Sequence, residues 1–415
     1  MNELQAIVKA YKEACAQEQR AALATVVNVN GSAYRRPGAR MLITESGHCV
    51  GSISGGCLER DVVERATEVM SSGAARIIEY DTRGSEDIIW GLGLGCNGVV
   101  QVLLESLEEG SCGARALQFI KDCLHANKSG VLATVIRASK TANHKKGEGR
   151  AVEVGERLFL NQELNLCNRP FTNSELVALI HEDAQNALAG KGAKICSYEI
   201  SAGCQTAIFF DVIAPPLSLV VFGAERDAEP VVQMARTLGW HTTVVDTRAR
   251  VATLERFREA DAVVLCRAEE IAARVPLMPG MAAVVMTHNY LDDVDLLRTL
   301  LSSEISYLGI LGPKQRTAKL FTDLRAEGIE LLDSDLARLH SPIGIDIGAE
   351  TPEEIALAIA AEINAVCMAR GGSFLRSRNA PIHDEHDAGP RSSKASVEQY
   401  VAVGESALLT VCHSS

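Results

Sequence analysis

A glycine-rich segment that contains a cysteine lies early in the chain. Residues 51–59 read Gly-Ser-Ile-Ser-Gly-Gly-Cys-Leu-Glu, with Ser54-Gly55-Gly56-Cys57 at the centre. Residues 49–53 before it have the pattern of a strand, and residues 58–70 after it have the spacing of a helix. Backbone amides at such a turn face the positive end of the helix dipole, which suits a phosphate or a thiolate. We expect Cys57 to be a better nucleophile or soft-metal ligand than the other cysteines; a tight turn with a buried cysteine is the alternative.

Two further segments offer groups that would complete an anion site. Residues 35–40 read Arg-Arg-Pro-Gly-Ala-Arg, so Arg36 and Arg40 could hold a phosphate or a carboxylate in bidentate fashion. Residues 91–98 read Gly-Leu-Gly-Leu-Gly-Cys-Asn-Gly, and glycines such as Gly95 let a ligand approach the backbone closely. Cys96 would then face Cys57 across a shared cleft. A solvated loop and a bent strand entry are the respective alternatives.

A turn in the second half of the chain has the position of a dinucleotide-binding fingerprint. Gly223 opens this turn after an apolar run, and Asp246 ends the next apolar run, where a ribose-binding acid belongs. Glu225 replaces the second glycine of the fingerprint, and its charge and bulk would oppose a pyrophosphate. The sequence therefore predicts a Rossmann-type fold and argues against NAD binding. His288 follows a further apolar run, at a strand end where such sheets bind ligands; a structural hydrogen bond is the alternative.

The elements that must position the first site follow from the spacing of apolar residues. The pattern predicts helices over 4–20 and 58–70, and strands over 21–28, 39–44, 49–53, 77–80 and 99–104. In the less regular part that follows, it predicts strands over 131–136 and 206–211 and a helix near 173–189. We interpret residues 1–213 as an N-terminal α/β domain in which residues 108–213 form an inserted elaboration.

Paired prolines at Pro215-Pro216 mark the expected start of a second domain. Beyond them, strands are predicted over 217–222, 241–246, 262–266, 282–287 and 307–311, and helices over 227–238, 292–302, 314–327 and 352–367. Runs of Val and Leu without polar alternation indicate strands buried on both faces, as in a parallel sheet covered by helices. We therefore predict a Rossmann-like, doubly wound parallel-sheet domain over 214–372 and a flexible tail over 373–415.

Composition excludes several classes of protein. The chain has 415 residues, a formal net charge of -12 and only 4% aromatic residues, which argues against nucleic-acid binding. Its apolar runs are far shorter than the roughly 20 residues of a membrane-spanning helix. Twelve cysteines occur without a CxxC motif, which argues against a zinc ribbon or a disulfide framework. The start of the chain lacks the pattern of a secretory signal, so we expect a cytoplasmic protein.

Taken together, these segments resemble the XdhC/CoxI family, the accessory proteins of molybdenum hydroxylases such as xanthine dehydrogenase. The N-terminal resemblance rests on Gly-Ser-Ala-Tyr-Arg-Arg-Pro-Gly-Ala-Arg-Met over 31–41 and on the motifs over 50–59 and 91–98. The C-terminal resemblance rests on Thr287-His288, on Leu-Gly-Ile-Leu-Gly over 308–312 and on Ser-Pro-Ile-Gly-Ile-Asp-Ile-Gly-Ala-Glu-Thr-Pro-Glu-Glu-Ile over 341–355.

The resemblance implies a protein that binds the molybdenum cofactor (molybdopterin), protects it and assists its sulfuration and insertion into an apo molybdenum hydroxylase. Such a chaperone has no turnover of its own, and its other expected partners are a cysteine desulfurase and a second copy in a homodimer. The residues offered for the cofactor are Arg36, Arg40, Ser54, Gly55, Gly56, Cys57, Gly95 and Cys96, with Cys57 as a molybdenum contact. Gly223, Asp246 and His288 form a secondary nucleotide-like site, and an NAD(P)-dependent oxidoreductase using the C-terminal domain is the alternative.

Overall fold

The chain forms two compact units, residues 2–215 and a second unit that begins at Pro216. A computed structural model describes residues 3–31, 33–83, 98–138, 152–163, 165, 174–190, 193–201, 204–249 and 251–379. Most of the tail predicted over 373–415 lies outside these residues. No helix in the described part of the chain combines the length and the hydropathy that crossing a membrane requires.

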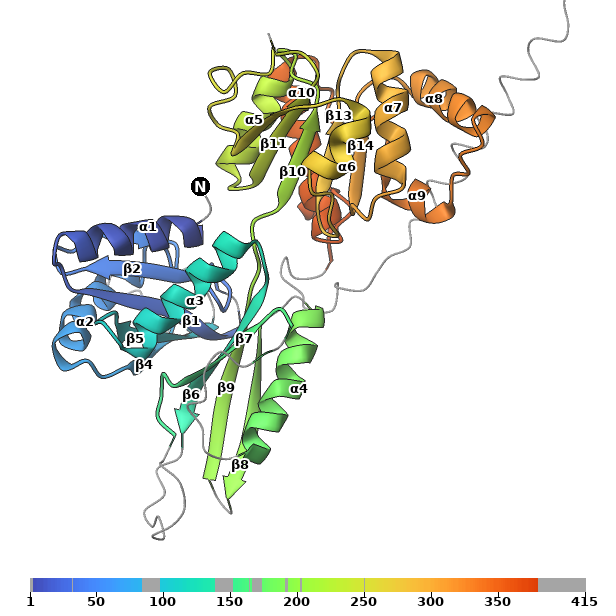
Figure 1. Cartoon of the computed structure of the whole chain (residues 1–415). Helices are drawn as coiled ribbons and strands as arrows, with labels where there is room; N and C mark the ends of the chain where they lie inside the picture. Colours follow the sequence, from blue (N-terminus) through green and yellow to red (C-terminus); the bar gives the residue numbers. More distant parts are fainter. Residues whose placement is uncertain are drawn as a thin grey trace, which may run out of the picture. The chain divides into compact units, whose positions relative to one another are not determined.

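The first half of the first unit is built on a five-stranded antiparallel sheet (Figure 1). Its elements are α1 (Glu3–Ala16), β1 (Ala21–Gly31), β2 (Arg40–Thr44), β3 (Cys49–Gly51), α2 (Glu59–Ser72), β4 (Arg76–Asp81) and β5 (Gly98–Ser106), and the strand order is β3-β2-β1-β5-β4. Side chains alternate between the two faces of a strand. In β1, Ala22 and Ala24 therefore pack with α2, whereas Leu23 packs with α1 on the opposite face. The predicted helices and strands are present here with small shifts at their ends.

The second half of the first unit has a sheet of its own. Its elements are α3 (Cys112–Ala126), β6 (Gly130–Ala138), β7 (Arg157–Asn161), α4 (Ser174–Gly190), β8 (Lys194–Ser201) and β9 (Cys204–Ile213), with antiparallel order β7-β6-β9-β8. Helix α4 packs on this sheet through Leu176 and Ile180, which belong to one buried cluster with Val131 and Phe210. The sequence predicted β6, β9 and α4 but missed α3, β7 and β8. The segment expected to elaborate the first sheet is thus an α/β layer in itself.

The second unit is a six-stranded parallel sheet with helices on both faces (Figure 1). Its elements are β10 (Ser218–Phe222), α5 (Ala228–Thr237), β11 (His241–Asp246), β12 (Ala262–Leu265), η2 (Ala268–Glu270), α6 (Ile271–Arg274), β13 (Ala282–Val285), α7 (Tyr290–Leu301), β14 (Tyr307–Ile310), α8 (Lys314–Ala326), α9 (Asp333–Arg338), β15 (Leu339–His340), α10 (Pro352–Cys367) and η3 (Leu375–Ser377). Leu219 and Val221 face α5 and α10, whereas Val220 and Phe222 face α6, α7 and α8. This confirms the prediction of a Rossmann-like, doubly wound domain.

The strand order of the second unit fixes where a ligand would bind. The order is β12-β11-β10-β13-β14-β15, so the direction of winding reverses between β10 and β13. In sheets of this kind, ligands bind at the carboxyl ends of the strands at this reversal. The predicted nucleotide-like residue Gly223 follows β10 directly, and His288 is the third residue after β13, so the fold places both near this point.

Candidate functional site

The glycine segment forms the connection from β3 to α2, as the sequence predicts. Two of its glycines have backbone conformations that other residues rarely adopt, with φ +86° at Gly51 and +106° at Gly56. At Gly51 a side chain is also excluded by space, because a Cβ atom would lie 2.4 Å from the carbonyl oxygen of Arg40. The connection is therefore held tightly against β2 at its start and turns sharply before α2 begins.

Several backbone amides of this connection donate to side chains of the chain itself. The Ser54 hydroxyl oxygen accepts hydrogen bonds from the amides of Gly56, Cys57 and Leu58 at 3.2, 3.1 and 3.2 Å. The Glu59 carboxylate accepts from the amides of Ser54 and Leu58 at 2.9 and 3.1 Å, and from the Ser54 hydroxyl. A carboxylate in the first turn of α2 also suits the helix dipole. Four of the amides that were expected to hold a guest anion therefore have partners within the chain, and two of them donate to the Glu59 carboxylate.

Cys57 lies half-buried on the wall of a small pocket. The pocket has a volume of about 20 Å³, which is room for a single water-sized group. Its lining residues are Ala33, Tyr34, Arg35, Ile53, Ser54, Cys57, Leu58, Thr82 and Val100. Cys57 is therefore neither sealed among aliphatic side chains nor fully exposed. Among the described residues, no group of three or more His, Cys, Asp or Glu side chains could hold a metal ion.

Tyr34 is a candidate that the sequence prediction missed. Its side chain is 68% exposed beside the glycine connection, and a Cβ atom at Gly55 would lie 3.6 Å from the tyrosine ring. An exposed aromatic ring at the rim of a pocket is a surface on which a flat ligand can stack. The signal was available, because a tyrosine directly before the predicted arginines stands out in a chain that is 4% aromatic.

The three arginines of the 35–40 turn have three different environments. Arg36 is exposed to solvent, and Arg35 is half-buried and forms an ion pair with Glu3. Arg40 is buried: its guanidinium pairs with Asp211 of β9 and donates to the carbonyl oxygen of Gly38 at 2.9 Å. The expectation that Arg40 holds a cofactor anion is not supported, because its charge is already paired in the interior.

The second glycine cluster lies largely outside the described residues, and Gly95 and Cys96 are among those left out. Its flanks are described. Thr82 and Gly98 hold the two ends together, since the Gly98 carbonyl oxygen accepts from the Thr82 amide at 2.8 Å and from its hydroxyl at 2.7 Å. Thr82 also lines the pocket of Cys57. The segment that contains Cys96 therefore leaves and rejoins the sheet at this pocket.

The predicted ribose-binding acid of the second unit is engaged by an arginine. Asp246 accepts from the Ala224 amide at 2.8 Å and from two guanidinium nitrogens of Arg248 at 2.9 and 2.8 Å. Arg248 also pairs with Glu225 at 2.6 Å. Burial alone would raise the pKa of the Asp246 carboxyl, but the hydrogen bonds from Arg248 and Ala224 outweigh it and hold the pKa below its ordinary value. A ribose hydroxyl would have to displace Arg248 to reach this carboxylate.

His288 has a structural hydrogen bond, in agreement with the alternative interpretation. Its Nε2 lies 2.6 Å from a carboxylate oxygen of Asp227, the residue before α5, and its side chain is 53% exposed. The backbone of His288 adopts φ +58°, which is uncommon for a residue other than glycine. This bond ties the end of β13 to the start of α5 across the reversal point.

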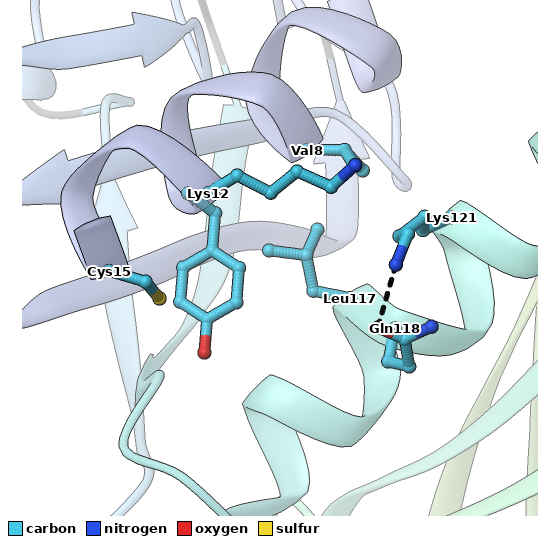
Figure 2. Close-up of a pocket in the computed structure, with 7 residues that line it drawn as sticks. Val8, Lys12, Cys15, Leu117, Gln118 and Lys121 are labelled. Carbon is cyan, nitrogen blue, oxygen red and sulfur yellow. Dashed lines mark hydrogen bonds between the residues drawn. The ribbon is translucent and has the colours of Figure 1, made fainter.

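A larger pocket lies between α1 and α3, away from all the predicted site residues (Figure 2). It has a volume of about 180 Å³ and is lined by Val8, Tyr11, Lys12, Cys15, Leu117, Gln118 and Lys121. Burial and a hydrogen bond with Cys15 raise the pKa of the Tyr11 hydroxyl to about 12, and this hydroxyl donates to the Leu107 carbonyl oxygen at 2.9 Å. Tyr11 therefore stays protonated at neutral pH and links α1 to the end of β5.

Two family models match the chain. Residues 219–363 match the XdhC Rossmann domain, and residues 14–81 match the XdhC and CoxI family. The two matches fall in the two compact units of the structure. The first contains the reversal point of the parallel sheet, and the second contains the arginine turn and the connection with Cys57.

Individual relatives are similar over different parts of the chain. A Bacillus subtilis (strain 168) protein, named as a probable subunit of xanthine dehydrogenase, is 32% identical over 347 residues, which are 83% of this chain and 93% of that protein. "Molybdenum cofactor insertion chaperone PaoD" of Escherichia coli (strain K12) is 38% identical over 97 residues, which are 23% of this chain and 29% of that protein. A crystal structure at 2.80 Å, described as a xanthine dehydrogenase from Bacillus halodurans, has a TM-score of 0.70 and 28% identity, covering 88% of this chain and 97% of that one.

Proposed function

Because the chain belongs to the XdhC and CoxI family, we propose that it binds the molybdenum cofactor and assists its insertion into an apo molybdenum hydroxylase. The names of two relatives support this role, one as a probable part of xanthine dehydrogenase and one as a molybdenum cofactor insertion chaperone. The cofactor is cargo in this role, and the chain turns over no substrate of its own. Sulfuration of the bound cofactor by a cysteine desulfurase, and pairing of two copies, belong to the same proposal through the family resemblance.

The observation that carries the proposal is the half-buried thiol of Cys57 in a pocket that the exposed ring of Tyr34 also lines, with the exposed Arg36 two residues further along the same turn. A pterin dithiolene with a phosphate and an oxidised metal needs a soft ligand, a cation and a flat apolar surface. Cys57 supplies the thiol, Arg36 the guanidinium and Tyr34 the ring. The amides of Ser54, Gly56, Cys57 and Leu58 already donate to the side chains of Ser54 and Glu59.

The size of the pocket limits how the cofactor can bind. A volume of about 20 Å³ admits a water-sized group, so a pterin has to lie across the mouth of the pocket. In this arrangement Cys57 holds the metal end and Arg36 the phosphate. Gly95 and Cys96 are proposed as the remaining contacts, because their segment leaves and rejoins the sheet at Thr82 on the pocket wall.

Uptake of molybdopterin tests this proposal. Purified protein is incubated with molybdopterin and desalted, and the retained pterin is measured by fluorescence after oxidation. Cys57→Ala and Arg36→Ala are each expected to weaken uptake about tenfold, which corresponds to about 1.4 kcal/mol of binding free energy. Matched controls are Cys15→Ala on α1 and Arg258→Ala in the second unit, both exposed and neither of them lining the pocket of Cys57. Unchanged uptake in both test variants would show that the site lies elsewhere.

An NAD(P)-dependent oxidoreductase is the second candidate function, and the strand order of the second unit favours it. The Arg248 contacts with Asp246 and Glu225 oppose it, since they close the ribose position and leave a carboxylate where a pyrophosphate would pass. Calorimetric titration with NAD and NADP is therefore expected to show no binding at micromolar concentrations. Micromolar affinity would instead favour the oxidoreductase, and Arg248→Ala would then be expected to change that affinity.

A further inference from the structure

The two sheets of the first unit have the same topology. In each sheet, a first helix precedes a central strand, and the following strand pairs with one edge of that central strand. A second helix then precedes a two-stranded hairpin, and the last strand of this hairpin pairs with the other edge of the central strand. The orders β2-β1-β5-β4 and β7-β6-β9-β8 correspond strand for strand, and every pairing is antiparallel. Helices α1 and α2 correspond to α3 and α4. Strand β3 is an addition of the first half.

The agreement extends to the register of single residues. The tetrapeptide Leu-Ala-Thr-Val occupies residues 23–26 of β1 and recurs over 132–135 of β6. Directly after this tetrapeptide, the register of each strand shifts by one residue. The shift lies between Val26 and Asn28 in the pairing of β1 with β5, and between Val135 and Arg137 in the pairing of β6 with β9. Two independent strands rarely share a sequence and a bulge at the same position.

The same turn follows in both halves. Val26 donates to the Ala39 carbonyl oxygen and accepts from the Gly38 amide at 2.9 and 2.7 Å. In the second half, Val135 donates to Glu156 and accepts from Gly155, both at 2.9 Å. Gly38 and Gly155 both have positive φ, +96° and +89°. The turn that carries the predicted arginines thus has a counterpart in the second half.

Two buried ion pairs join the halves reciprocally. Arg40 lies opposite Thr25 in the first sheet, and Arg157 lies opposite Thr134 in the second. Arg40 pairs with Asp211 of the second half, whereas Arg157 pairs with Glu105 of the first. The two acids are equivalent as well, since they lie opposite the two leucines of the repeated tetrapeptide. Reciprocal contacts of this kind are the signature of two like bodies packed about a two-fold axis.

The apolar contact between the halves has the same symmetry. One buried cluster contains Val27 and Ile136, the two residues at the bulges. The cluster also contains Leu103 and Phe209, which lie opposite Thr25 and Thr134. We infer that the first unit consists of two copies of one α/β layer, and that the second copy positions the turn that carries Tyr34 and Arg36 in the first.

The copies differ where the candidate site lies. The first copy has the glycine connection between β3 and α2, and it joins β4 to β5 through residues 82–97. The second copy joins β8 to β9 through residues 202–203, and the connection from β7 to α4, residues 162–173, contains no glycine. The segments proposed to hold the cofactor thus belong to the first copy alone, and the second copy contributes support.

Asp211 is the positioning residue through which this support acts. It fixes Arg40, which in turn donates to the Gly38 carbonyl oxygen at 2.9 Å. It also lies against the turn, because a Cβ atom at Gly38 would be 3.0 Å from an Asp211 carboxylate oxygen. The same turn carries Tyr34 and Arg35, which line the pocket of Cys57. This inference rests on the proposed function for its effect on cofactor uptake.

The equivalence of the two ion pairs provides a matched experiment on the full chain. Asp211→Asn and Glu105→Gln each remove one acid of an equivalent pair, so both are expected to lower the midpoint of urea unfolding by similar amounts. Only Asp211→Asn is expected to speed alkylation of Cys57 by N-ethylmaleimide, measured by peptide mass spectrometry. The same variant is expected to weaken molybdopterin uptake about tenfold, or about 1.4 kcal/mol. Should Asp211→Asn not fold, Arg40→Lys replaces it and Arg157→Lys is its control, because an ammonium cannot reproduce the guanidinium contacts.

The outcomes separate this inference from the proposed function. If the rate of Cys57 alkylation changed equally in Asp211→Asn and Glu105→Gln, or changed in neither, the positioning role of Asp211 would be overturned. Wild-type protein that takes up no molybdopterin would refute the proposed function. If the rate of Cys57 alkylation nevertheless differed between Asp211→Asn and Glu105→Gln, that difference alone would support the positioning role of Asp211.

Discussion

Replacing Arg157 with alanine is expected to lower the free energy of unfolding of the first unit by about 3–5 kcal/mol. Its guanidinium and the Glu105 carboxylate are 4% and 3% exposed and meet through two bonds of 2.6 Å. Burial alone would lower the pKa of Arg157, but the attraction of Glu105 outweighs it and raises the pKa. Alanine would leave Glu105 charged and buried without this partner, and the desolvation of the carboxylate would no longer be offset.

Hydrogen exchange read from peptides of β5 and β6 in increasing urea measures this loss in the first unit separately from the second. The exposed pair Lys128–Glu163, at 57% and 51% exposure, provides the control. Lys128→Ala should cost less than about 1 kcal/mol, because exposed pairs are solvated and screened. The double variant Arg157→Met, Glu105→Leu should be more stable than Arg157→Ala, since it removes both charges together. A cost for Arg157→Ala no larger than that for Lys128→Ala would contradict the argument.

The sequence predicts the second unit better than the first. Strands β10, β13 and β14 of the second unit are buried at every residue and are mostly apolar, and such a pattern indicates burial on both faces, so the parallel sheet follows from local residues. In the first unit, β7 (Arg-Leu-Phe-Leu-Asn) and β8 (Lys-Ile-Cys-Ser-Tyr-Glu-Ile-Ser) were missed because polar residues interrupt their apolar pattern, although β8 pairs with β9, the next strand along the chain. The repeat of Leu-Ala-Thr-Val over 23–26 and 132–135 was the available signal. This repeat is only four residues long. It indicates a duplication only once the pairing register of β1 and β6 is known, and the structure provides that register.

The same distinction holds for the candidate site. The connection with Cys57 follows from a local strand-to-helix pattern, and the structure has it at that place. The burial of Arg40 depends on its ion pair with Asp211, a residue of another sheet. No pattern of residues near Arg40 in the sequence predicts this partner. The return of Glu59 to Ser54 is local but depends on the turn geometry between them. Sequence pattern thus locates the segments, whereas the partners of the charged groups decide which of them remain available to a ligand.

Replacing Gly223 with alanine is expected to lower the free energy of unfolding of the second unit by about 2–5 kcal/mol, the sum of backbone strain and overpacking. Gly223 has φ +112°, and a Cβ atom there would lie 2.4 Å from the carbonyl oxygen of Met286. Because the obstructing atoms are backbone, no side-chain rotation can relieve the contact. Glycine at this position lets the ends of β10 and β13 approach each other at the reversal of the sheet.

Gly328→Ala is the matched control for this prediction, because Gly328 has φ +85° but no atom within 4 Å of the added Cβ. It should cost about 1–2 kcal/mol from strain alone. Unfolding of the second unit is followed by the fluorescence of Trp240, which is buried in its core, in a Trp90→Phe background. If Gly223→Ala and Gly328→Ala lowered the free energy of unfolding by equal amounts, the close approach of Met286 to Gly223 would contribute nothing to the destabilisation. A larger cost at Gly223 assigns the excess to the contact between β10 and β13, since conformational strain is common to both positions.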